Sequence, residues 1–167
     1  AVKTPGETIF PYLQENLDDI ITIEDDELIV AFLDILENHK MLVENSGLLT
    51  VAALKHLKPE GKKVVSILSG GNMDIITLDS VVQNGLIKRS RNFTVSVLLP
   101  DVPGQLNKVS KVIADVQGNV IKLEHNQFVS VNRNSSVELT ITMEAFGHDH
   151  KKKIIDALRA AGFKPKE

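Results

Sequence analysis

The chain has 167 residues, a formal net charge of -3 and no cysteine, and 43% of its residues are hydrophobic. This length allows one domain or two small ones, and the lack of cysteine excludes a disulfide framework, a thiolate zinc site and a cysteine nucleophile. The basic residues are scattered, which excludes nucleic acid as a favoured partner, and no apolar run reaches the roughly 20 residues that span a membrane. We therefore expect a cytoplasmic protein with neither nucleic acid nor a membrane as its partner.

Helical periodicity dominates roughly the first 80 residues. Apolar residues recur three and four positions apart after the acidic run 24–27, and acidic residues suit a helix start. They are Leu28, Ile29, Phe32, Ile35 and Leu36. A second helical run extends from Gly47 to Leu57, where the proline and glycine of 58–61 end it, and a third extends from Ile75 to Leu86.

A change of period separates the last two of these helices. Residues 62–68 form a short apolar run rich in β-branched side chains, which predicts a buried strand. The run stops at Ser69-Gly70-Gly71-Asn72, and a strand that enters a glycine loop is a common geometry for a ligand site. The polar segment 88–91 divides regions of different periodicity, so we predict a domain boundary there, with domains at 1–90 and 91–167.

The pattern becomes regular from Asn92 onwards. Apolar residues alternate with polar ones over 93–99 and again over 137–143, and Ile121, Leu123 and His125 share one face of a further strand. Helical stripes follow over 106–116 and 154–161, and residues 163–167 leave room only for a short or missing last strand. The order β-α-β-β-α, with a possible final β, predicts an α+β, ferredoxin-like βαββαβ domain.

A turn between the first strand and first helix of this domain carries the best candidate ligand site. It reads Asp101, Val102, Pro103, Gly104, Gln105 and Leu106. Because Gly104 has no Cβ, a small molecule can approach the backbone, and the N–H groups at the helix start attract a carboxylate. We expect an amino acid to bind here and Asp101 to meet its ammonium. The alternative is that Pro103 and Gly104 only form a tight turn.

With this proline-glycine turn and the leucine that follows it, residues 92–167 resemble an ACT domain. The resemblance implies a small amino-acid effector, such as isoleucine, valine, threonine or serine, allosteric regulation, and a homo-oligomer formed through this domain. His125 would then contact the ligand across a dimer, or would be an ordinary half-buried histidine.

Three pieces of the first 90 residues resemble the end of the catalytic domain in fold-type II pyridoxal-phosphate enzymes, an α/β fold. They are 2–7 (VKTPGE), 18–23 (DDIITI) followed by the acidic helix start, and 68–74 (LSGGNMD). The order of these pieces, with an ACT-like domain after them, is typical of threonine dehydratases. The serine racemase relatives of those enzymes match less well because of the ACT-like domain.

The resemblance assigns roles in binding pyridoxal 5'-phosphate. Ser69 would face the pyridine nitrogen of the cofactor, where a neutral hydroxyl is enough for loss of a β-hydroxyl from the substrate. Gly70 and Gly71 would let the backbone pass close to the ring, and Asn72 would hold the loop. Glu44 matches a family glutamate before a helix that borders the cofactor pocket, although Asn45 stands where glycine or proline is more usual.

The family's S-F-K-x-R-G motif, whose lysine attaches the cofactor, and its four-glycine phosphate loop do not occur in the sequence. We therefore interpret the chain as a C-terminal fragment of a threonine ammonia-lyase, which would convert L-threonine to 2-oxobutanoate and ammonia, with L-serine as a second substrate, and we expect the fragment to be inactive. The complete enzyme could serve isoleucine biosynthesis or a catabolic role. The alternative is an autonomous amino-acid-binding regulatory module without catalysis.

His148-Asp149-His150 offers two imidazoles and a carboxylate, which are good ligands for a metal ion. Adjacent loop residues before a helix are more often caps and solvated side chains, so we expect no bound metal.

Overall fold

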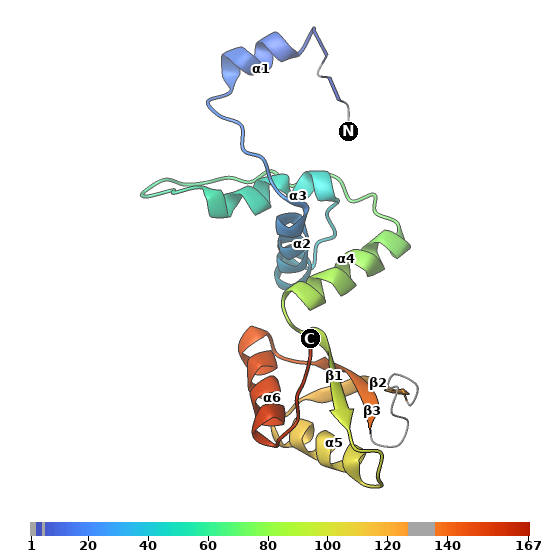
Figure 1. Ribbon diagram of the computed structural model, residues 1–167. Coiled ribbons are helices and arrows are strands. Elements are labelled where there is room, and N and C mark those ends of the chain that lie inside the picture. Colours follow the sequence, from blue (N-terminus) through green and yellow to red (C-terminus); the bar gives the residue numbers. More distant parts are fainter. Residues whose placement is uncertain (1–2, 5, 127–135) are drawn as a thin grey trace. The chain divides into compact units, whose positions relative to one another are not determined.

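The computed structural model describes residues 3–4, 6–126 and 136–167 (Figure 1). The chain divides into two compact units, Ala1–Met73 and Asp74–Glu167. Residues 2 and 5 of the predicted 2–7 piece lie outside the described residues. None of the helices in the described part is long and apolar enough to cross a membrane.

The first unit is helical. It contains α1 (Phe10–Asn16), α2 (Asp25–His39), α3 (Asn45–Ala52) and the 3-10 helix η1 (Ala53–His56). The predicted acidic start of α2 is confirmed: the Glu24 amide donates to Glu27 Oε2 at 3.0 Å, which satisfies a backbone donor that a helix start leaves free. The buried hydrophobic residues are Leu28, Ala31, Phe32, Leu33, Ile35, Val43, Leu48 and Ala52, so the core of this unit lies between α2 and α3.

The strand predicted over residues 62–68 is wrong. The described chain has no helix or strand between Gly61 and Asp74, and Val65 and Ile67 are 86% and 73% exposed. A strand needs a neighbouring strand to hydrogen-bond with, and among the described residues this segment has none. The apolar pattern therefore predicted burial that the first unit does not supply.

The second unit contains α4 (Ile75–Lys88), β1 (Asn92–Leu99), α5 (Gln105–Asp115), β2 (Asn119–Asn126), β3 (Val137–Glu144) and α6 (His148–Ala160). Its three strands form an antiparallel sheet in the order β1-β3-β2. The predicted last strand is reduced to a single bridge on the free side of β1, where Ser96 and Lys166 exchange two backbone hydrogen bonds of 2.8 and 2.9 Å. The predicted α+β, ferredoxin-like fold is confirmed.

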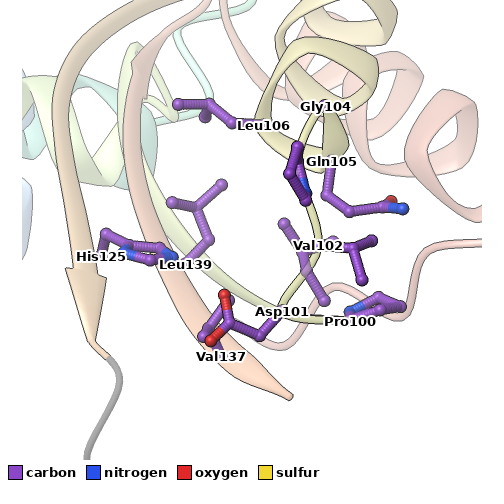
Figure 2. Close-up of a pocket in the computed structure, with 11 residues that line it drawn as sticks. Pro100, Asp101, Val102, Gly104, Gln105, Leu106, His125, Val137 and Leu139 are labelled. Carbon is purple, nitrogen blue, oxygen red and sulfur yellow. The ribbon is translucent and has the colours of Figure 1, made fainter. Parts of the chain in front are cut away.

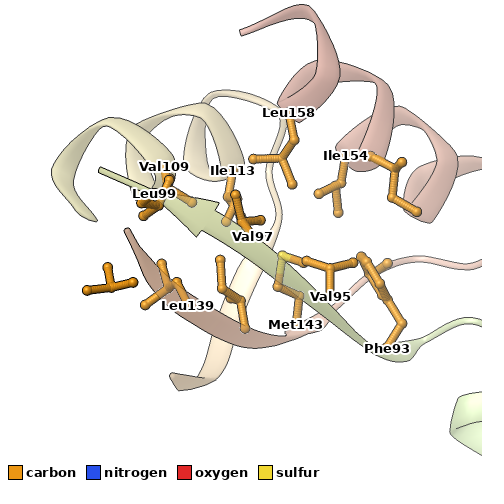
Figure 3. Close-up of a cluster of buried hydrophobic side chains, with 14 residues drawn as sticks. Phe93, Val95, Val97, Leu99, Val109, Ile113, Leu139, Met143, Ile154 and Leu158 are labelled. Atoms are coloured by element: carbon orange, nitrogen blue, oxygen red, sulfur yellow. The ribbon is translucent and has the colours of Figure 1, made fainter. Parts of the chain in front are cut away.

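One face of this sheet forms the core with α5 and α6. Figure 3 shows the side chains of β1 and β3 directed toward Val109 and Ile113 of α5 and toward Ile154 and Leu158 of α6. Burial alternates along both strands, and Leu139, Ile141 and Met143 are completely buried. The period-2 pattern in the sequence therefore identified the buried face correctly.

Strand β2 departs from the prediction through a β-bulge between Val120 and Lys122. Leu123 lies opposite Ile141 and His125 opposite Leu139, so these two share one face, as predicted. Ile121 is the extra residue of the bulge and does not belong to this set. A bulge shifts the alternation by one residue, and the sequence pattern did not show it.

The predicted boundary at residue 90 differs from the division between the two units, because α4 is grouped with the sheet that it contacts through β1. The segment 88–91 is also hydrogen-bonded: the Arg91 amide donates to Leu86, and the Arg91 carbonyl accepts from Ala145 at 2.7 Å. The domain assignment of α4 stays a prediction.

Candidate functional site

The predicted ligand loop forms one wall of a pocket of about 490 Å³ in the second unit (Figure 2). All seven residues predicted for this site line it: Asp101, Val102, Pro103, Gly104, Gln105, Leu106 and His125. The remaining lining residues are Leu99, Pro100, Val137 and Leu139. The structure thus brings His125 close to a loop some twenty residues away in the sequence.

Strand register explains this meeting. Leu99 at the end of β1 pairs with Val137 at the start of β3, and His125 near the end of β2 pairs with Leu139. Since Leu99, Val137 and Leu139 are at most 5% exposed, the floor of the pocket is aliphatic. The loop after Leu99 lines the same pocket.

The start of α5 supplies the polar part of the pocket. Gly104 is the N-cap residue with φ 88° and ψ -7°, a left-handed conformation that favours glycine, and no side-chain hydrogen bond caps the helix. The first intrahelical bond runs from the Lys108 amide to Gly104. The amides of Gln105, Leu106 and Asn107 precede it and belong to the N–H groups that a helix leaves for a ligand or water.

The side chains around the loop differ in their directions. In Figure 2, the amide of Gln105 extends away from the side on which His125 and Leu139 lie, whereas the Asp101 carboxylate lies beside Val137. Leu106 is 48% exposed and faces the pocket, although its spacing placed it on the core stripe with Val109 and Ile113. The predicted apolar stripe of α5 therefore divides into two parts: Leu106 lines the pocket, whereas Val109 and Ile113 belong to the core.

A second group of predicted residues meets in the first unit. The Glu44 amide donates to the Gly70 carbonyl at 3.3 Å, and a Cβ on Gly70 would lie 2.8 Å from Glu44 Cγ and closer still to its carboxylate. Gly70 also has φ 74°, a left-handed conformation that favours glycine. Glu44 and the 69–71 turn, predicted separately from the sequence, thus form one cluster.

Ser46 is a member of this cluster that the sequence did not single out. Its hydroxyl donates to Glu44 Oε1 at 2.9 Å and so orients the carboxylate beside Gly70. A hydroxyl two residues after an acid at a helix start is a local signal, since serine often bonds to nearby polar groups there.

Asp74 is a second residue that was missed, although it closes the predicted 68–74 piece. It is the N-cap residue of α4, and its carboxylate accepts from the amides of Ile76 and Thr77 at 3.0 and 2.9 Å. Hydrogen bonds from the Thr77 hydroxyl and then from the Thr77 amide lower the pKa of Asp74 below its ordinary value. Asp74 followed by an apolar helical run is a recognisable N-cap pattern.

The two histidines of the possible metal motif have other partners. His148 Nδ1 lies 2.9 Å from the Ser90 hydroxyl, while His150 accepts the Phe146 amide at Nδ1 and bonds to the Val116 carbonyl at Nε2. The part of the chain that the structure describes contains no group of three or more potential ligands that could hold a metal ion.

The chain is similar in sequence to known threonine ammonia-lyases and threonine dehydratases. The chain is 32% identical to an L-threonine ammonia-lyase of Geobacter sulfurreducens over 165 residues and 30% identical to that of Thermotoga maritima over 164 residues. A biosynthetic L-threonine dehydratase of Pasteurella multocida is 28% identical over 167 residues. Each match covers 98% of the chain. The chain is homologous to part of the threonine ammonia-lyases.

The predicted resemblance to threonine dehydratases is therefore confirmed. The chain spans 41% of the length of the first two relatives and 31% of the third. No family model matches the chain.

Proposed function

We propose that this chain is the C-terminal part of a threonine dehydratase and joins the end of a pyridoxal-phosphate catalytic domain to an effector-binding ACT domain. The relatives cover nearly the whole chain, which supports the first half of the proposal. The observation that carries the second half is the pocket over the aliphatic floor, because all seven residues predicted for the ligand line it.

The complete enzyme would convert L-threonine to 2-oxobutanoate and ammonia, and L-serine to pyruvate and ammonia. When bound, the cofactor would supply an electron sink for loss of the β-hydroxyl group. Residues of this chain fit one edge of the cofactor ring. The exposed Ser69 hydroxyl would meet the ring nitrogen, and the glycine turn beside Glu44 would let the ring approach the backbone. Asn72 would hold the end of the loop.

The chain alone would be inactive, because the motif lysine that attaches the cofactor does not occur in the sequence. Incubation with pyridoxal phosphate and threonine should therefore yield no 2-oxobutanoate. Turnover that survives repurification would contradict this proposal.

The pocket would bind the carboxylate, the ammonium and the side chain of the effector through different residues. The carboxylate would bind the free N–H groups at the start of α5, and the ammonium would bind Asp101. The side chain would rest on Leu99, Val137 and Leu139. Because these buried residues offer no partner for a hydroxyl, isoleucine and valine should bind more tightly than threonine and serine.

Calorimetric titration of the whole chain with these four amino acids tests the effector site. Asp101→Ala should weaken binding by about 1–3 kcal/mol, the range for loss of a charged hydrogen bond. Asp115→Ala is the matched control, since it removes an exposed carboxylate at the other end of α5 and should leave affinity unchanged. If the wild type binds none of the four, the effector proposal fails.

The second unit would also self-associate. Among the described residues β2 is an edge strand that pairs only with β3, and its Ile121 and Leu123 are 46% and 38% exposed. An exposed strand edge of this kind pairs readily with another copy. Sedimentation that shows only monomer at high protein concentration would exclude this assembly.

The alternative of an autonomous amino-acid-binding module is favoured by one observation: the second unit has a closed hydrophobic core of its own. A longer gene product that carries the cofactor lysine would favour the dehydratase. A product without it would favour the module.

A further inference from the structure

One face of α3 contacts the extended segment 66–70 at three places. The contacts involve Glu44, the N-cap residue of α3, and Gly47 and Thr50 within the helix, which are spaced three residues apart and therefore lie along one side of it. Their partners occur in the reverse order along the chain, so the segment runs antiparallel to the helix.

Thr50 holds the beginning of the segment. Its hydroxyl donates to the Ile67 carbonyl at 2.9 Å, and the Ser66 hydroxyl donates back to the Thr50 carbonyl at 3.2 Å. Two hydrogen bonds in opposite directions fix this part of the segment against the helix.

Gly47 marks the closest approach. It is buried, and a Cβ there would lie 2.8 Å from the Ser69 carbonyl carbon and closer still to the carbonyl oxygen. Any side chain at position 47 would therefore displace the Ser69 backbone.

Glu44 holds the other end through its amide, which donates to the Gly70 carbonyl at 3.3 Å. The backbone is thus held before Ser69, at Ser69 and after it. A sheet ladder would normally hold a segment with this strand-like sequence, and here the helix face takes that role.

We propose that the face of α3 formed by Glu44, Gly47 and Thr50 positions the Ser69 hydroxyl, with Gly47 and Thr50 as positioning residues. The cofactor-facing role of Ser69 rests on the proposed function, whereas its placement by α3 rests on the contacts alone.

Nuclear magnetic resonance of the whole chain tests this placement through the amide and Cβ chemical shifts of Ser69. Gly47→Ala should displace these shifts through the overlap with the Ser69 carbonyl. Thr50→Val keeps the shape of the side chain but loses the hydroxyl, so it should displace them as well, and Thr50→Ser should restore them. Leu49→Ala removes a 43% exposed side chain from another face of α3 and should leave them unchanged.

Thermal melts of the same variants separate positioning from simple stabilisation. If Gly47→Ala fails to fold, the Thr50 pair still decides the question. A lower melting temperature with unchanged Ser69 shifts in Thr50→Val would overturn the proposal, and so would Ser69 shifts in Thr50→Ser that match those of Thr50→Val. None of these readings depends on the cofactor, so failure of the dehydratase proposal would leave them valid.

Discussion

The two units of the chain bury their apolar residues to very different degrees. In the second unit, alternating residues of β1 and β3 and the stripes of α5 and α6 close a core in which seven of the described side chains are completely buried. They are Val97, Val109, Leu139, Ile141, Met143, Ile154 and Leu158. In the first unit, α1 buries no residue, and the apolar segment 62–68 lies largely exposed. A hydrophobic pattern becomes a core only where its partner surface belongs to the same unit.

The largest expected effect is the difference in stability loss between one truncation in the second unit and one in the first. Leu139→Ala removes a completely buried side chain and should lower the free energy of unfolding by about 2–5 kcal/mol. Val65→Ala removes one that is 86% exposed and should change it by less than about 0.5 kcal/mol. Urea denaturation measures both, and equal effects would show that the contrast in burial is not real.

The difference in burial between the two units also explains which strands could be predicted from the sequence. Alternation over 93–99 and 137–143 identified strands that do pair, because both strands lie in the chain. The apolar, β-branched run over 62–68 also predicts a strand, but it carries no information about whether a partner strand exists. The bulge in β2 has no such signal, since only the pairing with β3 reveals Ile121 as the extra residue.

The ligand site shows a similar limit. The loop 101–106 could be found from its proline-glycine turn, and its meeting with His125 depends on register that the sequence does not encode locally. A valine at position 104 would block a ligand from approaching the backbone, and allowing that approach is the role that the sequence predicts for this glycine. Its φ of 88° adds a conformational cost, and binding and folding are not separable with valine.

Alanine at two glycines separates these effects in the second unit. Gly104 and Gly162 both have φ 88°, and a Cβ at either would meet no atom within 4 Å. Each Gly→Ala change should therefore destabilise the protein by about 1–2 kcal/mol, the cost of a left-handed conformation. Only Gly104→Ala should also weaken amino-acid binding in calorimetry. Equal affinities for the two variants would place the ligand elsewhere.

A smaller loss of stability is expected when the pH is lowered, and it comes from a carboxyl group in the first unit. A hydrogen bond from Lys55 above all, followed by the Glu24 amide and then His56, lowers the pKa of Glu27 from 4.5 to about 2. A carboxyl whose pKa is lower in the folded state stabilises the protein above pH 4.5, and this contribution is lost as the pH falls toward 2.

Thermal melts between pH 5 and pH 3 measure this loss. The melting temperature of the wild type should fall over this range, and that of Glu27→Gln should fall less because glutamine does not titrate. Parallel curves for the two proteins would show that the ionised Glu27 carboxylate adds nothing to stability through its contacts with Glu24, Lys55 and His56.

The most direct test of the account follows the backbone amides of the 15N-labelled chain by nuclear magnetic resonance while isoleucine is added. A carboxylate held by the start of α5 should shift the amides of Gln105, Leu106 and Asn107, together with that of His125 across the pocket. Amides of the first unit should stay unchanged. Saturable shifts confined to residues outside the pocket, or no shift at all, would contradict the proposed effector site.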